Sequence, residues 1–284
     1  MKRIGHKKAQ QIQKRFLQVL RFFMALLFFC ATARGQTVST NFSFNEFLLV
    51  PVRVHLLSAT HLPNLATTLT TNDIKRIFGK VNRVWAQAGV HFYLESVIKE
   101  DAAHQEFQSQ LADFGDRFAL ESFRPEESQA KKMFHVYYIK SMQMNGICFP
   151  ESIFVKDTAA LRQVEGGIDE PLPRVTSHEL GHALSLDHRQ NTTNLMASGT
   201  SGFVLNESEI QQSRSSAQKL DWIESAPALL KKADELFRRK KFGEAKIFYS
   251  RLADISVKGK EVDLAKFRSQ VSQTPRLLRS PKQQ

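Results

Sequence analysis

Apolar residues recur along the first part of the chain with the periods of strands and helices. The run FLLVPVRVHLL at 47–57 is rich in β-branched and apolar residues, which is typical of a strand. From Ile74 to Ala88 the apolar positions follow helical spacing and stop at Gly89, which predicts a helix. Residues 90–98 then indicate a second strand. This order predicts a βαβ unit with parallel strands.

The segments that follow extend the predicted sheet. MFHVYYI at 133–139 is predicted to be a third strand. GICFPESIFVKD at 146–157 contains Pro150, which has no amide hydrogen for a central strand, so this segment is predicted to be an edge strand. Residues 158–173 are predicted to form a loop that opens onto a helix near Pro173.

Residues 1–35 have the composition of a secretory signal peptide. They contain eight Lys or Arg residues and no acidic residue, and an apolar run at 22–29 precedes the small-x-small pattern Ala31-Thr32-Ala33. A membrane-spanning helix needs about 20 apolar residues, so an uncleaved anchor is the less favoured alternative. We therefore predict a secreted or periplasmic mature chain without a stable membrane span.

The basic character of the chain belongs to its two ends. The formal net charge is +12, whereas residues 36–225 alone contain more acidic than basic residues. No nucleic-acid-binding motif with interleaved aromatic residues accompanies the basic ends, so no nucleic-acid partner is expected. Within the predicted mature chain Cys148 is the one cysteine. We expect it to be a buried small apolar residue, with a zinc-blocking role as the alternative.

The C-terminal region differs in pattern from the rest. Residues 225–257 are predicted to form a helical hairpin that resembles a single tetratricopeptide unit, with Gly243 near its turn. No second copy is present, so a hairpin packed on the main domain is favoured over a module that binds a protein partner. Residues 258–284 are basic and are predicted to form a disordered tail.

The stretch SHELGHALSLDH at 177–188 carries the candidate chemistry. His178 and His182 are four residues apart, so on a helix both imidazoles project from one face, the geometry for two ligands of one Zn²⁺. Glu179 points about 100° away around the helix, where it can reach a water as a general base. His188 follows six residues after His182, and a single cation would satisfy all three imidazoles.

HELGHALSLDH resembles the metzincin signature H-E-x-x-H-x-x-G-x-x-H, and NLMAS downstream supplies Met196 for the Met-turn of that family. The resemblance covers about residues 47–224. It implies an α+β, zincin-like catalytic domain over 36–224, with a mixed, mostly parallel sheet, an active-site helix and a Met-turn. The helical hairpin would follow this domain.

The function that this resemblance implies is zinc-dependent hydrolysis of peptide bonds by an endopeptidase. One catalytic Zn²⁺ would be held by His178, His182 and His188, and Glu179 would be the general base. Met196 would form a hydrophobic floor beneath the metal. A protein or peptide substrate would lie extended along the edge strand, with a specificity pocket shaped by residues 197–204.

The sequence departs from the family pattern at one position. Ser185 stands where the family has Gly, so we expect a non-glycine residue with positive φ at a cost of about 1 kcal/mol. Asp187 is a competitor of His188 for the third ligand position. A gluzincin-like site would instead take Glu207 or Glu209, which would leave His188 without a role.

Two other classes of function remain open at this stage. The chain could be a zinc-binding pseudoenzyme or scaffold that acts through its C-terminal hairpin, or a metallohydrolase of non-peptide amides or esters. The presence of Glu179 favours catalysis, because a purely structural zinc has no use for a base.

Overall fold

The computed structural model describes residues 42–105, 117–129 and 132–271. The predicted signal peptide at 1–35 lies outside these residues. The strands of the structure are β1 (Leu48–Ser58), β2 (Val90–Asp101), β3 (Phe134–Ile139), β4 (Gly146–Cys148), β5 (Ser152–Lys156) and β6 (Glu224–Ser225). The α-helices are α2 (Thr71–Trp85), α3 (Arg117–Ser122), α4 (Pro171–Ala183), α5 (Glu207–Gln218), α6 (Ala226–Arg238), α7 (Phe242–Ala253) and α8 (Lys260–Val271). Short 3-10 helices are η1 (Phe44–Glu46), η2 (Ala86–Ala88) and η4 (Glu126–Gln129).

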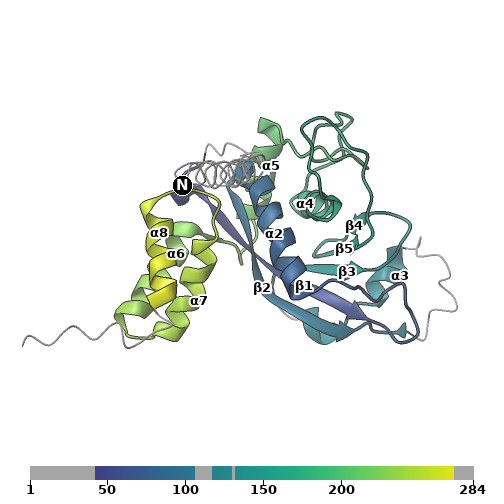
Figure 1. The fold of residues 1–284 in the computed structure, drawn as a ribbon. Coiled ribbons are helices and arrows are strands. Elements are labelled where there is room, and N and C mark those ends of the chain that lie inside the picture. The colour runs from purple at the N-terminus through teal and green to yellow at the C-terminus, as the bar shows by residue number, and fades with distance from the viewer. Residues whose placement is uncertain (1–41, 106–116, 130–131, 272–284) are drawn as a thin grey trace, which may run out of the picture. The chain divides into compact units, whose positions relative to one another are not determined.

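The strands form one mixed sheet in the order β2-β1-β3-β5-β4 (Figure 1). β1 pairs in parallel with β2 and β3, and β3 pairs in parallel with β5, while β4 and the short β6 are antiparallel to their neighbours. The predicted mixed, mostly parallel sheet is confirmed.

The predicted βαβ unit is present as β1, α2 and β2. Thr70 and Asp73 form the capping box that begins α2, and Gly89, at φ 60°, turns the chain into β2. The apolar face of α2, with Ile77 and Phe78, packs with Val52 and its neighbours on β1 in the largest apolar core. The sequence signals that predict the helix and the burial of its apolar side chains therefore agree over this unit.

β2 is a terminal strand of the described sheet, and one side chain of α2 caps its backbone. Asn82 Nδ2 donates to the Phe92 carbonyl at 2.9 Å, and the Phe92 amide donates to Asn82 Oδ1 at 2.8 Å. Because the side-chain amide supplies both a donor and an acceptor, it takes the place that a neighbouring strand would occupy at Phe92.

The opposite edge differs from the prediction of a single edge strand at 146–157. The structure has two antiparallel strands there, β4 and β5, and β4 is the terminal one. Pro150 lies in the turn between them, and the Phe149 amide donates to the Ser152 carbonyl at 2.7 Å. The proline thus separates two strands that reverse direction, because it cannot continue a ladder of backbone hydrogen bonds.

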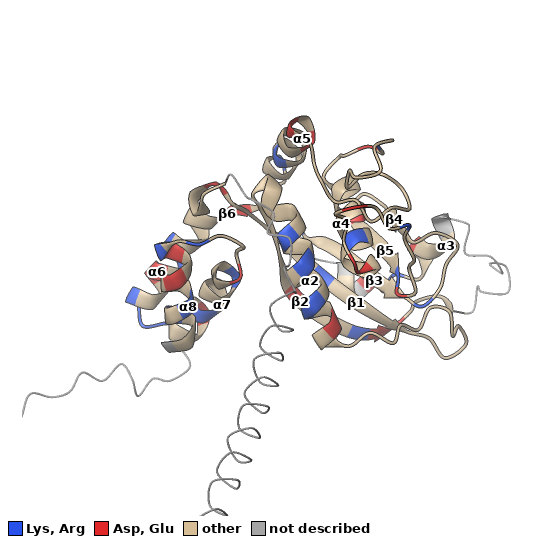
Figure 2. Ribbon diagram, turned by 45° about the horizontal axis from the view of Figure 1, so that its top comes forward, with Lys and Arg blue, Asp and Glu red and all other residues tan. Residues whose placement is uncertain are grey.

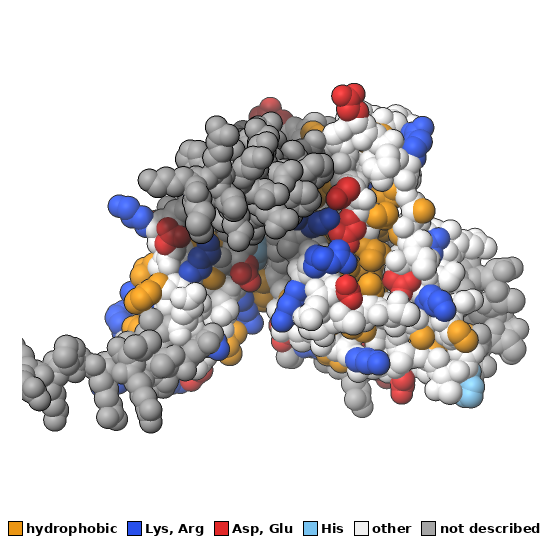
Figure 3. Space-filling view, in the orientation of Figure 1, with side chains coloured by type: hydrophobic (Ala, Val, Ile, Leu, Met, Phe, Trp, Pro, Cys, Tyr) orange, Lys and Arg blue, Asp and Glu red, His pale blue; other side chains and the backbone are white. Residues whose placement is uncertain are grey.

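α4 begins at Pro171, two residues before the predicted Pro173, and its start is tied to α2 by charge. Glu170 forms ion pairs with Arg76 and, at 2.7 Å, with Lys80. Acidic and basic side chains lie next to one another over this region (Figure 3). Farther along, Leu172, Val175 and Leu180 enter the same core as α2. The helix that carries the candidate site is therefore held by both charge and apolar packing.

Three helices follow the sheet where a two-helix hairpin is predicted. α6, α7 and α8 share an apolar core with Leu49 of β1 and with Phe47, which directly precedes that strand. The prediction of a disordered tail over 258–284 is wrong for Lys260–Val271, which forms α8. Val262 and Ala265 are buried in that core, but charged residues surround them in the sequence and hide the helical pattern. Residues 272–284 lie outside the described part of the chain.

Charge on the C-terminal helices is mixed. Lys and Arg residues of α6, α7 and α8 lie among acidic residues, and a further group of Lys and Arg lies along α2 (Figure 2). In the described ranges, no helix is long and apolar enough to cross a membrane.

Candidate metal centre and active site

The three histidines meet at one point because the chain reverses direction after α4. His178 and His182 are one turn apart on the helix. Ser185 then takes a left-handed conformation, with φ 68°, as predicted for the position where the resembled family has Gly. The Leu186 amide donates to the Gly181 carbonyl at 2.9 Å, which closes the turn and directs His188 back toward the helix.

Their Nε2 atoms are separated by the distances expected for ligands of a single ion. His182 Nε2 lies 3.2 Å from His178 Nε2 and 3.1 Å from His188 Nε2. Two nitrogen ligands of a tetrahedral zinc, each about 2.0–2.1 Å from the metal, stand about 3.3 Å apart. The donor atoms of these three residues lie within 4.8 Å of one another.

Hydrogen bonds at Nδ1 of two rings fix which ring nitrogen is available to bind a cation. His178 Nδ1 donates to the Leu195 carbonyl at 2.8 Å, and His182 Nδ1 donates to the Leu186 carbonyl at 2.7 Å. Burial lowers the pKa of His178 to about 3, and burial also lowers the pKa of His182, so both rings are neutral. Each Nε2 therefore carries a lone pair directed at its neighbours, an arrangement that a cation stabilises.

Glu179 lies off the ligand face, between α4 and β4. The residue is 5% exposed, and burial raises the pKa of its carboxyl to about 8, while the charge of Arg174 acts in the opposite direction. A cation held by the three histidines would act in the same direction as Arg174 and favour the carboxylate. A group balanced in this way can both accept and release a proton near neutral pH.

Arg174 is a residue that sequence reasoning missed. It lies one turn before His178 on α4 and is buried, with Nε donating to the Gly202 carbonyl at 2.9 Å. Nη2 donates to the carbonyls of Asn194 and Ala197. The guanidinium thus holds both ends of the loop at 194–202. Its position one turn before His178 was the available signal.

Met196 lies in this loop and is buried against α4. A Cβ built on Gly181 would come within 2.6 Å of the Met196 sulfur, so the helix has no side chain where the methionine packs. The Met196 amide donates to Asn194 Oδ1 at 2.6 Å. Met196 therefore packs against α4 at Gly181, the residue before His182, and its role as a floor beneath a metal stays a prediction.

The alternative ligands are placed elsewhere. Among the described residues, the cluster able to hold a metal consists of the three histidines and does not include Asp187 or Glu207. Glu209 is buried and receives hydrogen bonds from Arg189 Nε at 2.7 Å and Asn194 Nδ2 at 2.8 Å. Glu209 therefore secures the loop around Met196.

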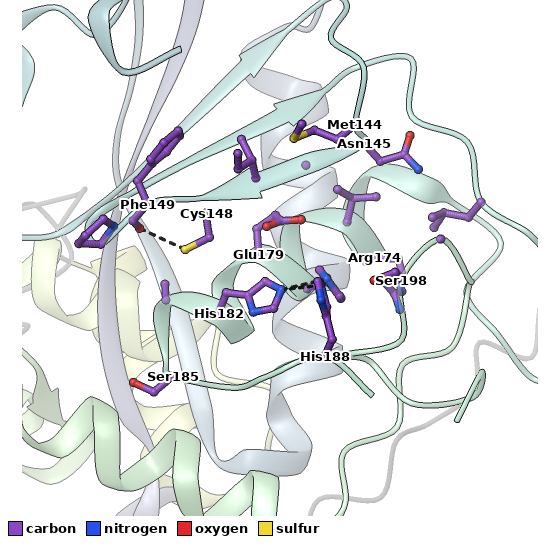
Figure 4. Close-up of a pocket in the computed structure, with 18 residues that line it drawn as sticks. Met144, Asn145, Cys148, Phe149, Arg174, Glu179, His182, Ser185, His188 and Ser198 are labelled. Atoms are coloured by element: carbon purple, nitrogen blue, oxygen red, sulfur yellow. Dashed lines mark hydrogen bonds between the residues drawn. The ribbon is translucent and has the colours of Figure 1, made fainter. Parts of the chain in front are cut away.

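A cleft of about 960 Å³ opens over the histidines (Figure 4). One wall is the edge segment 146–149, and the floor includes His178, Glu179 and His182 of α4. Ser198 and Gly199 of the loop after Met196 also line it. Cys148 is half-buried in the wall, where its Sγ donates to the Phe149 carbonyl at 3.1 Å.

Comparison with known proteins gives distant structural likenesses. No family model and no curated protein matches the chain. Metalloproteinase-II from Bacteroides fragilis is 12% identical with a TM-score of 0.41, over 65% of this chain and 58% of that one. Archaemetzincin from Methanopyrus kandleri is 12% identical with a TM-score of 0.35, over 60% and 93%. A zinc-dependent peptidase from Methanocorpusculum labreanum is 8% identical with a TM-score of 0.28, over 58% and 99%.

Proposed function

We propose that this protein is a secreted, zinc-dependent endopeptidase of the metzincin type, with one catalytic Zn²⁺ held by His178, His182 and His188. The observation that carries this proposal is the convergence of three Nε2 atoms, two of them on rings whose Nδ1–H is held by a carbonyl. One zinc ion satisfies these lone pairs together. Three protein ligands, rather than four, are typical of catalytic zinc sites, which keep a position for water or substrate.

Glu179 is the general base in this proposal. Zinc, when bound, supplies a Lewis acid that polarises the substrate carbonyl and acidifies a water. The Glu179 carboxylate accepts the proton of that water as it attacks the carbonyl carbon, and then returns the proton to the departing amine. The burial of Glu179, which raises its proton affinity, supports both halves of this task.

The cleft supports an extended peptide as the substrate. β4 is the terminal strand at one wall, and an added strand there would gain backbone hydrogen bonds with little demand on sequence. Ser198 and Gly199 face the cleft from the loop held by Arg174, so residues 197–204 are proposed to select a substrate side chain. A groove bounded along a strand suits an internal segment of a protein, and hence endopeptidase activity.

Hydrolysis of casein and of a quenched fluorescent peptide, with and without 1,10-phenanthroline, tests this function. We expect activity in the zinc-loaded protein, loss with the chelator, and recovery when zinc is added. Metal analysis should find about one zinc per chain. Zinc binding without hydrolysis of any peptide would contradict the proposal and favour a scaffold, whereas cleavage of only non-peptide amides or esters would favour the other metallohydrolase class.

Export and partner binding are further parts of the proposal. The N-terminal pattern supports cleavage between Arg34 and Gln36, and N-terminal sequencing of protein recovered outside the cytoplasm would test it. A full-length N-terminus in the membrane fraction would contradict it. The C-terminal helices are proposed to pack on the sheet. Binding of a protein partner by these helices is the alternative, and a pull-down with the mature chain would test it.

A further inference from the structure

Gly146, the first residue of β4, lies directly against the Glu179 side chain. A Cβ built on Gly146 would lie 2.5 Å from Oε1, 2.7 Å from Cγ and 2.8 Å from Cδ of Glu179. All three separations are shorter than van der Waals contact. The overlap with Cγ matters most, because rotating the carboxylate about its last bond leaves Cγ in place. A side chain at 146 would therefore require the whole Glu179 side chain to move.

Space, and not backbone conformation, accounts for glycine at this position. The glycines with positive φ in the described chain are Gly89, Gly166 and Gly199, so the backbone of Gly146 is one that other residues can adopt. At Gly79, by contrast, an added Cβ would have no atom within 4 Å. Gly146 thus differs from an ordinary glycine in what occupies the volume beside its Cα.

The backbone around Gly146 is held in place. Gly146 pairs with Val155 in the β4–β5 ladder, and the Lys156 amide donates to the Asn145 carbonyl at 2.9 Å. Asn145 Nδ2 donates to the Ala160 carbonyl at 2.7 Å. On the other side, α4 is fixed by the core and by the ligand histidines. Neither wall can retreat without breaking these contacts.

We propose that Gly146 is a positioning residue that gives the Glu179 carboxylate its place between α4 and the edge strand. The inference rests on the proposed function and adds to it a reason why the base lies beside β4. The missing side chain lets the carboxylate reach the strand along which an extended peptide is proposed to lie. In Figure 4 Glu179 lies between the edge segment and the histidines.

Gly146→Ala is the direct test. We expect a loss of about 100-fold in kcat, because a misplacement of about 1 Å can cost that much. KM should change little and zinc content should stay at its wild-type value, since the three histidines are untouched. Gly79→Ala is the matched control, with kcat expected to be unchanged. Full activity in Gly146→Ala would overturn the proposal.

A stability cycle with Glu179→Ala separates positioning from a general effect on the strand. In the wild-type background, Gly146→Ala should lower the Tm of the zinc-loaded protein by about 2–10 °C, as expected for overpacking. In the Glu179→Ala background the same change should have almost no effect, because the overlapping side chain is gone. An equal decrease in both backgrounds would mean that Gly146 serves the strand alone, and would overturn the proposal.

This cycle does not depend on catalysis, so the two proposals fail in different ways. A wild-type protein that binds zinc but cleaves no peptide would contradict the peptidase function, and the cycle would still measure the contact between positions 146 and 179. A crystal structure of Gly146→Ala gives a final check. We expect the Glu179 carboxylate to be displaced, and an unmoved carboxylate beside an undisturbed β4 would contradict the inference.

Discussion

Two groups of histidines in this protein have opposite arrangements of donors and acceptors. In the group formed by His178, His182 and His188, backbone carbonyls hold Nδ1–H of two rings, so lone pairs on Nε2 face one another. In the other group, on β1 and β3, His55 Nδ1 donates to Glu100, and His55 Nε2 lies 2.9 Å from His135 Nδ1.

The second arrangement is a chain of hydrogen bonds in which each ring donates to an acceptor, and it requires no metal. His55 is buried and stacked on Tyr137, with ring centroids 4.2 Å apart. The comparison teaches that the partner on the far side of each ring decides whether a histidine pair is a ligand set or a hydrogen-bonded chain. Proximity alone does not distinguish the two.

The largest expected effect separates catalysis from metal binding within the first group. Glu179→Gln should lower kcat by about 10²–10⁴-fold, the usual contribution of general acid–base catalysis. Zinc content should be unchanged, because Glu179 lies off the ligand face. Steady-state kinetics with metal analysis checks both, and Glu165→Gln, at an exposed glutamate, is the control. Release of zinc would show that Glu179 is a ligand or supports one.

Removing one member of the converging group should affect the metal directly. His188→Ala should weaken zinc binding by more than about 100-fold, since the loss of even an outer partner of a ligand costs about 10–100-fold. Competition with a chromogenic chelator measures this. Asp187→Asn is the matched control and should keep its zinc. Full retention of zinc in His188→Ala would mean that another residue is the third ligand.

Disrupting the hydrogen-bonded chain of His55 and His135 should lower the stability of the fold and leave zinc binding unchanged. His55→Leu removes two buried hydrogen bonds, so we expect the free energy of unfolding to fall by about 1–3 kcal/mol at neutral pH. Denaturant unfolding measures it, with His61→Leu, at an exposed histidine, as control. A loss of zinc in His55→Leu would contradict the separation of the two groups.

The same variant should alter the pH dependence of stability. Burial lowers the pKa of His55 more than Glu100 raises it. Because the folded pKa is below the unfolded value of about 6.5, the unfolded state binds the proton more tightly. The contribution of His55 is fully present above about pH 6.5 and is lost as the pH falls. His55→Leu should therefore lose less stability than the wild type on acidification.

The smallest expected effect concerns the turn that brings His188 to its partners. Ser185→Gly should raise the free energy of unfolding by at most about 1 kcal/mol, because glycine adopts φ 68° without the penalty of a side chain. Zinc content and kcat should stay unchanged. A clear loss of stability would show that the Ser185 side chain makes a stabilising contact.

Local features of this protein were predictable from sequence, and contacts between distant segments were not. The placement of His178 and His182 on one face follows from helix geometry, and the positive φ of Ser185 was expected from the resemblance, in which Gly stands at that position. The close approach of Glu179 to Gly146 joins segments more than thirty residues apart, and nothing in either segment indicates the other. Arg174 lies one turn before His178 in the sequence, but the carbonyl groups that it binds have no signature in the sequence.

The errors in the predicted elements have similar causes. The split of 146–157 into β4 and β5 depends on a reversal at Pro150, which a single proline indicates only as an interruption. α8 was missed because its buried residues, Val262 and Ala265, are few and lie among charged residues. Their burial comes from helices earlier in the chain, so it is a property of the tertiary structure.

The Asn82 amide on the backbone of Phe92 has a consequence for self-association. A sheet with two open edges can recruit strands from other molecules at either one, and exposed edges are sites of aggregation. Asn82 covers part of the β2 edge with a side chain of its own molecule. This contact leaves the Phe92 backbone less able to pair with a strand of another molecule. An Asn82→Leu protein should self-associate at lower concentrations than the wild type, which analytical size-exclusion chromatography would measure.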